Sequence, residues 1–389
     1  MQHEKQVYLS LLISFCYFGP FKMVSIPYRS VQYNNPTITK CSPLRCCYKK
    51  LGGTLGTLWR IVYICPKYPL PMNSLIFPPY AHEGDRVIIL SPSSKIDKAF
   101  LKGAAKRLKS WGLEVVMAKH AASSCGTYAG SIAQRLDDLQ QALDDEQAKI
   151  ILCSRGGYGA VHLVDKLDFT KFRQYPKWLI GFSDITALHN VFQYNGFASL
   201  HAPMARHLTV EPEDDFCTEA LRNILFGNAL AGDEPFSYVC PAHKLNHRGE
   251  ASGTLRGGNF AVAYGLRGTP YDIPAEGTVL FLEDVGERPH SVERMLYNLK
   301  LGGVLDRLSG LIIGQFTEYE ENMSLGKELY GALADVLKDY DYPICFGFPV
   351  GHVTMNVPLI NGAPVRLEVG RKEVKLSFLN ENKETITNL

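Results

Sequence analysis

The sequence carries almost no excess of charge of either sign. Its 41 lysines and arginines stand against 39 aspartates and glutamates, for a formal net charge of +2. It also lacks a zinc-finger pattern and an aromatic-basic RNP stretch. A nucleic-acid-binding protein needs a basic surface or such a motif. We therefore expect no nucleic-acid partner.

Paired cysteines are missing as well. The 10 cysteines include no CxxC pair, and adjacent Cys46 and Cys47 are a weak alternative as zinc ligands. We expect no metal. The five cysteines after Cys65 are scattered singly, as small buried apolar side chains of a reduced, cytoplasmic protein are.

An apolar run long enough to cross a bilayer is absent from the start of the chain. The apolar stretch at residues 7–21 is shorter than the about 20 residues that a spanning helix needs. It could be the core of a signal peptide, but no small-x-small cleavage site follows it. We expect residues 1–71 to be upstream sequence before a natural start at Met72, with a real extension as the alternative. No membrane partner is expected.

What the sequence does have, from Asp85 onward, is a regular alternation of apolar runs and amphipathic segments. It predicts strands at 86–92, 113–118, 149–154 and 177–182, and helices at 97–111, 131–145 and 159–167. Such alternation predicts an α/β fold with a parallel sheet, Rossmann-like or flavodoxin-like, at residues 72–205. Ligands of such sheets bind at the carboxyl ends of the strands.

The alternation stops in a segment rich in acidic residues, glycine and proline, and we place a linker at residues 206–248. Beyond it, residues 249–389 predict a smaller C-terminal domain of mixed β/α, swivelling type. Its expected strands are 278–285 and 308–316, and its expected helices are 291–305 and 324–338.

The stretch "KWLIGFSDITALHN", residues 177–190, places Ser183 between an apolar strand and a helical pattern. A serine at that place can cap the helix by accepting its free N–H groups. It can also be a nucleophile, lifted from the sheet by a tight turn at Gly181. The local pattern alone leaves both interpretations open.

Three other stretches hold chemistry-bearing residues at the ends of expected strands. "CSRGGYGA" is a glycine-rich turn that lacks both GxGxxG and GxxxxGK[ST], so its free N–H groups suit an oxyanion better than a nucleotide phosphate. "FLEDVGE" ends an apolar strand with Glu283 and Asp284. "FGFPVGHVTMNVP" places His352 in a loop flanked by prolines. Singly, each is as well explained by solvated turn or loop residues.

Taken in order, these stretches match a family. Between Leu75 and Phe378 the chain closely resembles the LD-carboxypeptidases, serine peptidases that include murein tetrapeptide carboxypeptidases and the microcin C immunity peptidases. The matching stretches are "PPYAHEGDRVIILSPSS", "CSRGGYGA", "LIGFSDITAL", "GTLRGGNF", "LFLEDVGERPHSVERML", "GLIIGQF" and "GFPVGH". The motif GxSxG is absent, so the α/β-hydrolase fold is not inferred.

The resemblance implies the roles of the catalytic residues. Ser183 is then the nucleophile, His352 the general base and Glu283 the residue that orients the histidine. The oxyanion hole is expected from the backbone N–H groups of the "RGG" turn and of the residue after the nucleophile: Gly156, Gly157 and Asp184. The side chain of Asp184 is left as a possible helix cap.

Four further family-like positions are candidates to line the substrate channel: Tyr128, Gly130, Asn259 and Arg288. Arg288 is the candidate to meet a carboxylate, since its planar fork suits one. An exposed arginine in a salt bridge is an equally good interpretation.

The resemblance implies a cytoplasmic homodimeric carboxypeptidase that removes terminal D-alanine from murein tetrapeptides in cell-wall recycling, with no cofactor. One alternative is a microcin C-type peptidase that cleaves peptidyl or aminoacyl nucleotides. The other is a muropeptide-binding protein without catalysis, against which the joint presence of Ser183, Glu283 and His352 argues.

Overall fold

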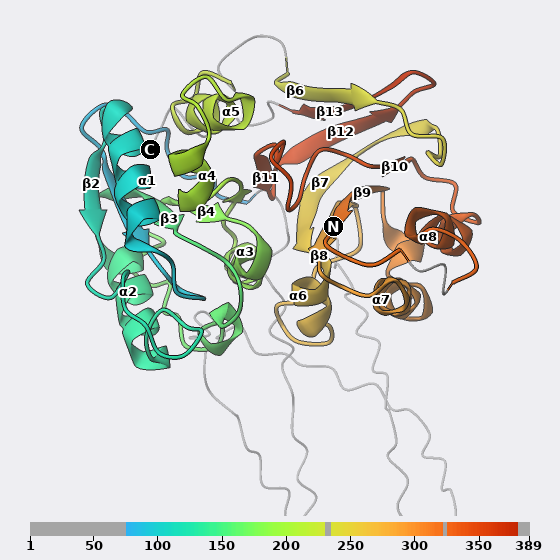
Figure 1. The fold of residues 1–389 in the computed structure, drawn as a ribbon. Coiled ribbons are helices and arrows are strands. Elements are labelled where there is room, and N and C mark those ends of the chain that lie inside the picture. Colours follow the sequence, from blue (N-terminus) through green and yellow to red (C-terminus); the bar gives the residue numbers. More distant parts are fainter. Residues whose placement is uncertain (1–74, 230–234, 322–324, 380–389) are drawn as a thin grey trace, which may run out of the picture. The chain divides into compact units, whose positions relative to one another are not determined.

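The computed structural model describes residues 75–229, 235–321 and 325–379, all of which belong to one structural unit (Figure 1). Residues 1–71, which we expect to be upstream sequence, lie outside these ranges. None of the described helices combines the length and the hydropathy that crossing a bilayer requires. Of the described cysteines, Cys125 is exposed, and four are buried without a disulfide: Cys153, Cys217, Cys240 and Cys345.

The first sheet has six strands in the order β11-β5-β4-β3-β1-β2 (Figure 1). Five are parallel: β1 (Arg86–Leu90), β2 (Glu114–Met117), β3 (Ala148–Cys153), β4 (Trp178–Gly181) and β5 (Ser199–His201). Their order 2-1-3-4-5 is that of flavodoxin-like folds, which confirms the expected class. The sixth, β11 (Leu359–Asn361), comes from the far end of the chain and pairs antiparallel with β5.

Both faces of this sheet are covered, which explains its continuous apolar strands. Val87 and Ile89 pack with α1 (Lys98–Ser110) on one face. Ile88 and Leu90 pack with α2 (Ile132–Asp144) on the other. The remaining helices of this part are α3 (Thr186–Tyr194), α4 (Ala205–Val210) and α5 (Phe216–Leu225).

The helix expected at 159–167 is wrong in length. Only a single 3-10 turn, η1 (Ala160–His162), forms there. Gly157 and Gly159 before it have φ of 104° and 127°, a region that breaks helical geometry. The N–H of Ala160 donates to the carboxylate of Asp184.

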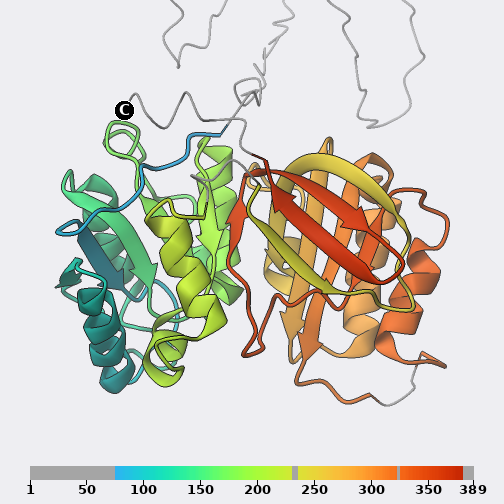
Figure 2. The ribbon, with the colours of Figure 1, turned by 90° about the horizontal axis from the view of Figure 1, so that it is seen from above.

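The second sheet has seven strands in the order β10-β9-β8-β7-β12-β13-β6 (Figure 2). Four run parallel: β7 (Gly249–Asn259), β8 (Thr278–Val285), β9 (Gly310–Thr317) and β10 (Ile344–Phe346). The other three are antiparallel: β6 (Ser237–Pro241), β12 (Pro364–Val369) and β13 (Glu373–Phe378). The mixed sheet is as expected, but with seven strands it is not smaller than the first in strand number.

Three helices accompany the second sheet: α6 (Phe260–Gly265), α7 (Pro289–Leu301) and α8 (Leu329–Leu337). A 3-10 turn, η3 (Leu305–Arg307), follows α7. Leu280 and Leu282 of β8 pack with the apolar side chains of α7 and α8 on one face of the sheet.

The segment 206–248 is not a structureless linker. It holds most of α4, all of α5 and the edge strand β6. The helix α4 contacts α1 beside the first sheet, and β6 pairs with β13 in the second. Its short elements are separated by the glycines and prolines that suggested a linker, so the sequence pattern hid them.

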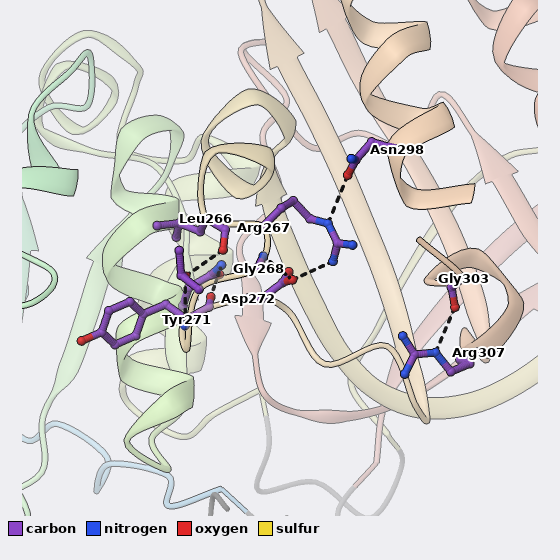
Figure 3. A network of polar contacts seen from close by, with 10 residues as sticks. Leu266, Arg267, Gly268, Tyr271, Asp272, Asn298, Gly303 and Arg307 are labelled. Carbon is purple, nitrogen blue, oxygen red and sulfur yellow. Dashed lines mark hydrogen bonds and ion pairs between the residues drawn. The ribbon is translucent and has the colours of Figure 1, made fainter. Parts of the chain in front are cut away.

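A loop after α6 makes hydrogen bonds to helices beside both sheets (Figure 3). Arg267 donates through Nη1 to Asp272 at 2.7 Å and through Nε to Asn298 of α7 at 3.3 Å. On its other side, the backbone oxygen of Tyr271 accepts from Asn190 of α3 at 3.0 Å. The loop thereby ties the helix that follows β4 to the helices of the second sheet.

The carboxyl end of β7 also approaches the start of α3. The N–H of Asn259 donates to the Thr186 hydroxyl at 2.9 Å. Gly258 has a φ of 144°, and a Cβ there would overlap the Thr186 side chain. Glycine is therefore required for this approach, which brings the end of β8 near the turn after β4 because β7 and β8 are neighbours.

Candidate active site

Ser183 sits on a strained turn at the carboxyl end of β4. Its φ is +66°, and Glu318 is its only non-glycine companion with positive φ in the described ranges. Such a conformation costs on the order of 1–3 kcal/mol and persists where the surrounding structure enforces it.

The 3-10 turn η2 (Ser183–Ile185) and then α3 follow, and neither has a side-chain cap. The helix-cap interpretation of Ser183 is therefore wrong.

Asp184 does not cap the helix either. Its buried carboxylate accepts from the N–H of Ala160 at 2.8 Å and from the Ser93 hydroxyl. Buried Arg135 donates to the backbone oxygens of Pro92 and Gly159, each at 2.7 Å. Together, Asp184 and Arg135 hold two loops of the first sheet against the Ser183 turn.

The glycine-rich turn lies directly against Ser183. A Cβ at Gly156 would lie 2.7 Å from the Ser183 Cβ and 3.1 Å from the backbone nitrogen of Asp184. Gly157 has a φ of 104°, and a Cβ there would overlap Ser94. The N–H groups of Gly156, Gly157 and Asp184 donate to no acceptor in the described part of the chain. Free N–H groups beside a hydroxyl can hold a negatively charged oxygen.

Glu283 and His352 form an ion pair on the side of the second sheet. Glu283 is fully buried near the end of β8, and its Oε2 lies 2.8 Å from His352 Nδ1. Gly351 permits this contact, because its φ is 130° and a Cβ there would lie 3.0 Å from the Glu283 Cβ. Its N–H donates to Asn356 at 3.0 Å, which fixes the loop that carries the histidine.

Opposing effects act on the pKa of His352. Burial lowers it, but the hydrogen bond and the charge of Glu283 raise it by more, with smaller contributions from Asp284 and Glu318. The net pKa lies above the ordinary histidine value. With Nδ1 donating to Glu283, the neutral ring offers Nε2 as a proton acceptor.

The neighbouring acid, Asp284, has a different role. Its carboxylate accepts from Asn259 Nδ2 at 2.9 Å, Ala261 N at 2.8 Å and Val285 N at 2.9 Å. Burial raises its pKa, and these hydrogen bonds partly offset the rise. The net pKa is about 6. Of the two acids at this strand end, it is Glu283 that contacts the histidine.

Ser183 and His352 line one cavity of about 1010 Å³. It is also lined by Gly156 and Gly157, and by Phe182, whose ring centroid lies 4.9 Å from that of His352. No hydrogen bond joins Ser183 to His352 among the described residues. Catalytic hydrogen bonds are often long until substrate binds, so the absence of this one does not exclude proton transfer between them.

The four candidates for substrate contact lie elsewhere. Tyr128 packs against Tyr158 and His162, Gly130 precedes α2 with a φ of 96°, Asn259 caps α6, and Arg288 is an exposed residue before α7. None of them lines the cavity that holds Ser183. Substrate contact by these four residues stays a prediction, and Asn259 is the register partner of Glu283 in the second sheet.

Charged residues that the sequence did not single out do line the cavity: Arg155, Arg206, Glu211 and Glu318. Arg155 lies inside the "SRGG" stretch, so its position beside the glycines was a usable signal. Arg206 falls in the segment interpreted as a linker, and Glu318 follows β9 without a motif.

A possible metal-ligand group lies apart from this cavity. Donor atoms of His120, Asp137 and Asp138 lie within 4.8 Å of one another. Both Asp138 oxygens already accept the backbone N–H of His120, and Asp137 is exposed. These contacts give a structural role to Asp138, and we assign no metal to the group.

Comparison with known proteins gives two matching family models. The LD-carboxypeptidase N-terminal domain matches residues 87–202, and the LD-carboxypeptidase C-terminal domain matches residues 252–367. A probable murein peptide carboxypeptidase of Bacillus subtilis is 31% identical over 307 residues, covering 77% of this chain and 94% of that protein. The two models divide between the parts that carry Ser183 and the Glu283–His352 pair.

Solved structures have the same fold. Muramoyltetrapeptide carboxypeptidase from Oxalobacter formigenes has a TM-score of 0.68 and 26% identity, over 75% of this chain and 98% of that one. A microcin C7 self-immunity protein in complex with aspartyl sulfamoyl adenosine has a TM-score of 0.69 and 20% identity, over 78% and 99%. At 20% identity, the similarity to the microcin C7 self-immunity protein concerns the fold alone.

Proposed function

The chain belongs to the LD-carboxypeptidase family of serine peptidases, and from this we propose that it releases terminal D-alanine from murein tetrapeptides in cell-wall recycling. The observation that carries the proposal is the cavity that holds both the strained Ser183 and the histidine paired with Glu283. The named activities of the bacterial relatives give the substrate class.

In the first half-reaction, Ser183 Oγ attacks the carbonyl carbon of the peptide bond before D-alanine, and His352 Nε2 takes the hydroxyl proton. The carbonyl oxygen becomes an oxyanion, which the free N–H groups of Gly156, Gly157 and Asp184 stabilise. The C–N bond then breaks, and His352 gives its proton to the leaving nitrogen. The products are an ester on Ser183 and free D-alanine.

In the second half-reaction, His352 takes a proton from a water molecule, whose oxygen attacks the ester carbonyl. The bond to Ser183 Oγ breaks, and His352 returns the proton to it. Glu283 holds the ring by its Nδ1–H throughout and stabilises the imidazolium by its charge. Apart from this water, the steps use only side chains and N–H groups of the chain.

The microcin C-type alternative has less support. Its structural relative is 20% identical, which extends to the fold only. A muropeptide-binding protein without catalysis would not need Glu283 buried against His352. Burying a carboxylate costs desolvation free energy, so such a pair is expected where it has a function.

The cytoplasmic location and the homodimer are also parts of the proposal, and both rest on the family resemblance. Light scattering on the purified protein tests the second. A mass of one chain at micromolar concentration would contradict it.

The test of the function uses two murein tetrapeptides that differ only in the configuration of the terminal alanine. We expect release of D-alanine, detected by mass, and a kcat/KM on the order of a thousandfold lower for the L form, because its carboxylate would occupy the wrong position. Equal rates would contradict the LD specificity. Binding without release would favour the non-catalytic alternative, and release from an aminoacyl nucleotide instead would favour the microcin C-type one.

A further inference from the structure

Two arginines are brought together at the wall of the catalytic cavity. The N–H of Ala205 donates to the backbone oxygen of Ser154 at 3.3 Å, which joins the segment after β3 to the start of α4. The next residue in each segment is an arginine, Arg155 in one and Arg206 in the other. Both line the cavity that holds Ser183 and His352.

Neither guanidinium has an acidic partner within the described ranges. Arg155 donates through Nη1 to the backbone oxygen of Lys95 at 3.0 Å, and Arg206 is exposed and makes no hydrogen bond or ion pair there. The cavity's acidic side chains, Asp97, Glu211 and Glu318, form no ion pair with either arginine within the described residues. Two arginines that line one cavity without an acidic partner give its wall a positive potential, which favours an anion.

Asp97 and His207 also line the cavity, and each has another partner. Asp97 caps α1 by accepting the N–H of Ala99 at 2.8 Å. His207 is paired with Asp215 at 2.7 Å. Neither Asp97 nor His207 forms an ion pair with Arg155 or Arg206 within the described residues.

Arg155 belongs to the glycine-rich turn that lies against the nucleophile. Arg155 directly precedes Gly156, where a Cβ would lie 2.9 Å from Ser183 Oγ. In a peptide whose last residue is removed, the terminal carboxylate is only two bonds beyond the nitrogen of the bond that is cut. A carboxylate-binding group for such a substrate must therefore lie close to the nucleophile, and both arginines line the cavity that holds Ser183.

We propose that Arg155 and Arg206 together bind the terminal carboxylate of the residue that leaves. The inference rests on the proposed function and deepens it, because it states why only the last residue is removed. A planar guanidinium donates two parallel hydrogen bonds to a carboxylate, and a second guanidinium balances the remaining charge. A chain that continues past the cut, or ends in an amide, has no charge to offer there. Arg288, the candidate from the sequence, is outside the cavity.

The test compares a tetrapeptide ending in D-alanine with the same peptide ending in D-alanine amide. The unaltered protein should cleave the free acid about 100-fold more efficiently in kcat/KM, since hydrogen bonds to a charged group are lost with the amide. Arg206→Ala should lower kcat/KM for the acid about 10- to 100-fold and change that for the amide less than about threefold. Arg155→Ala should act in the same direction, and Arg206→Lys should restore part of the preference.

Arg294→Ala is the matched control, since Arg294 is an exposed arginine of α7 that does not line the cavity. It should leave both rates unchanged. Melting temperatures of all variants separate a folding defect from a binding defect.

The outcomes distinguish the two proposals. If the unaltered protein releases nothing from either peptide, the proposed function fails. If it releases D-alanine but the preference for the free acid survives in Arg155→Ala/Arg206→Ala, the arginine proposal fails alone. Equal losses on both peptides, or loss of the preference in Arg288→Ala instead, would also overturn it.

Discussion

Ser183 and His352 face the same cavity, but the regions that position them rely on different interactions. The nucleophile depends on backbone geometry: a left-handed φ of 66°, a glycine turn against its side chain, and hydrogen bonds that hold the surrounding loops. The base depends on a side-chain contact, the 2.8 Å pair between His352 and a fully buried Glu283.

The difference predicts what each region tolerates. Strain at Ser183 is stored in the fold, so changes around it should alter rates and stability through loop position. The Glu283–His352 pair is electrostatic, so changes there should alter the dependence of rate on pH.

The largest effect is expected from removing either reacting side chain. Ser183→Ala and His352→Ala should each lower kcat by about four to six powers of ten, as losses from a serine triad do. Both residues are only partly buried, so the circular dichroism of each variant should match that of the unaltered protein. More than a tenth of the activity left in Ser183→Ala would show that it is not the nucleophile.

Glu283→Gln should lower kcat about 10²- to 10⁴-fold, because the imidazolium loses its counter-charge. The histidine acts as a base when neutral, and its pKa is raised above the ordinary value. In the unaltered protein, kcat/KM should therefore fall as pH drops through a pKa above 6.5. Without the Glu283 charge, burial lowers the pKa, and this limb should move to lower pH. A pH–rate profile measures it, and an unmoved limb would contradict the pairing.

Asp184→Asn tests the region of the nucleophile. The amide side chain of this variant would keep one acceptor oxygen but lose the charge that both Ser93 and Ala160 contact. We expect kcat to fall about 10- to 100-fold with KM within about threefold, because the N–H groups for the oxyanion lose their position. Asp165→Asn, at an exposed residue, is the control and should leave kcat and KM unchanged. An equal loss in the control, or a change in KM alone, would argue against a positioning role.

The smallest effect concerns stability. The free energy of unfolding of Ser183→Gly should exceed that of Ser183→Ala by about 1 kcal/mol, because glycine accepts a positive φ that alanine resists. Equilibrium urea unfolding of the two inactive variants gives the comparison directly. If the alanine variant is the more stable, the strained turn does not exist in solution.

The same contrast explains how far the sequence leads. The first sheet follows from local apolar runs, so periodicity suffices for it. The tight turn was expected at Gly181, but this glycine ends β4 and the left-handed φ is at Ser183 itself. The pairing of β11 with β5, across more than 150 residues, has no local signal. The short elements of 206–248 were missed because glycine and proline separate them, and Arg206 was missed with them.

Residues with two possible partners were the least predictable. Asp184 was a plausible helix cap, but its carboxylate contacts Ala160 and Ser93, which are distant in sequence. Arg288 stays a predicted carboxylate binder, although it does not line the cavity that holds Ser183. In both cases the decisive factor is tertiary proximity, which neither composition nor spacing encodes.

The central claim is that Ser183 from one sheet and His352 from the other act as a single catalytic unit. The most direct measurement is kcat for Ser183→Ala, His352→Ala and the double variant on the D-alanine tetrapeptide under one set of conditions. Residues that act together are strongly non-additive, so the double variant should be no slower than the slower single one. A double variant slower by a further factor of about ten or more, or a single variant near the unaltered rate, would contradict the account.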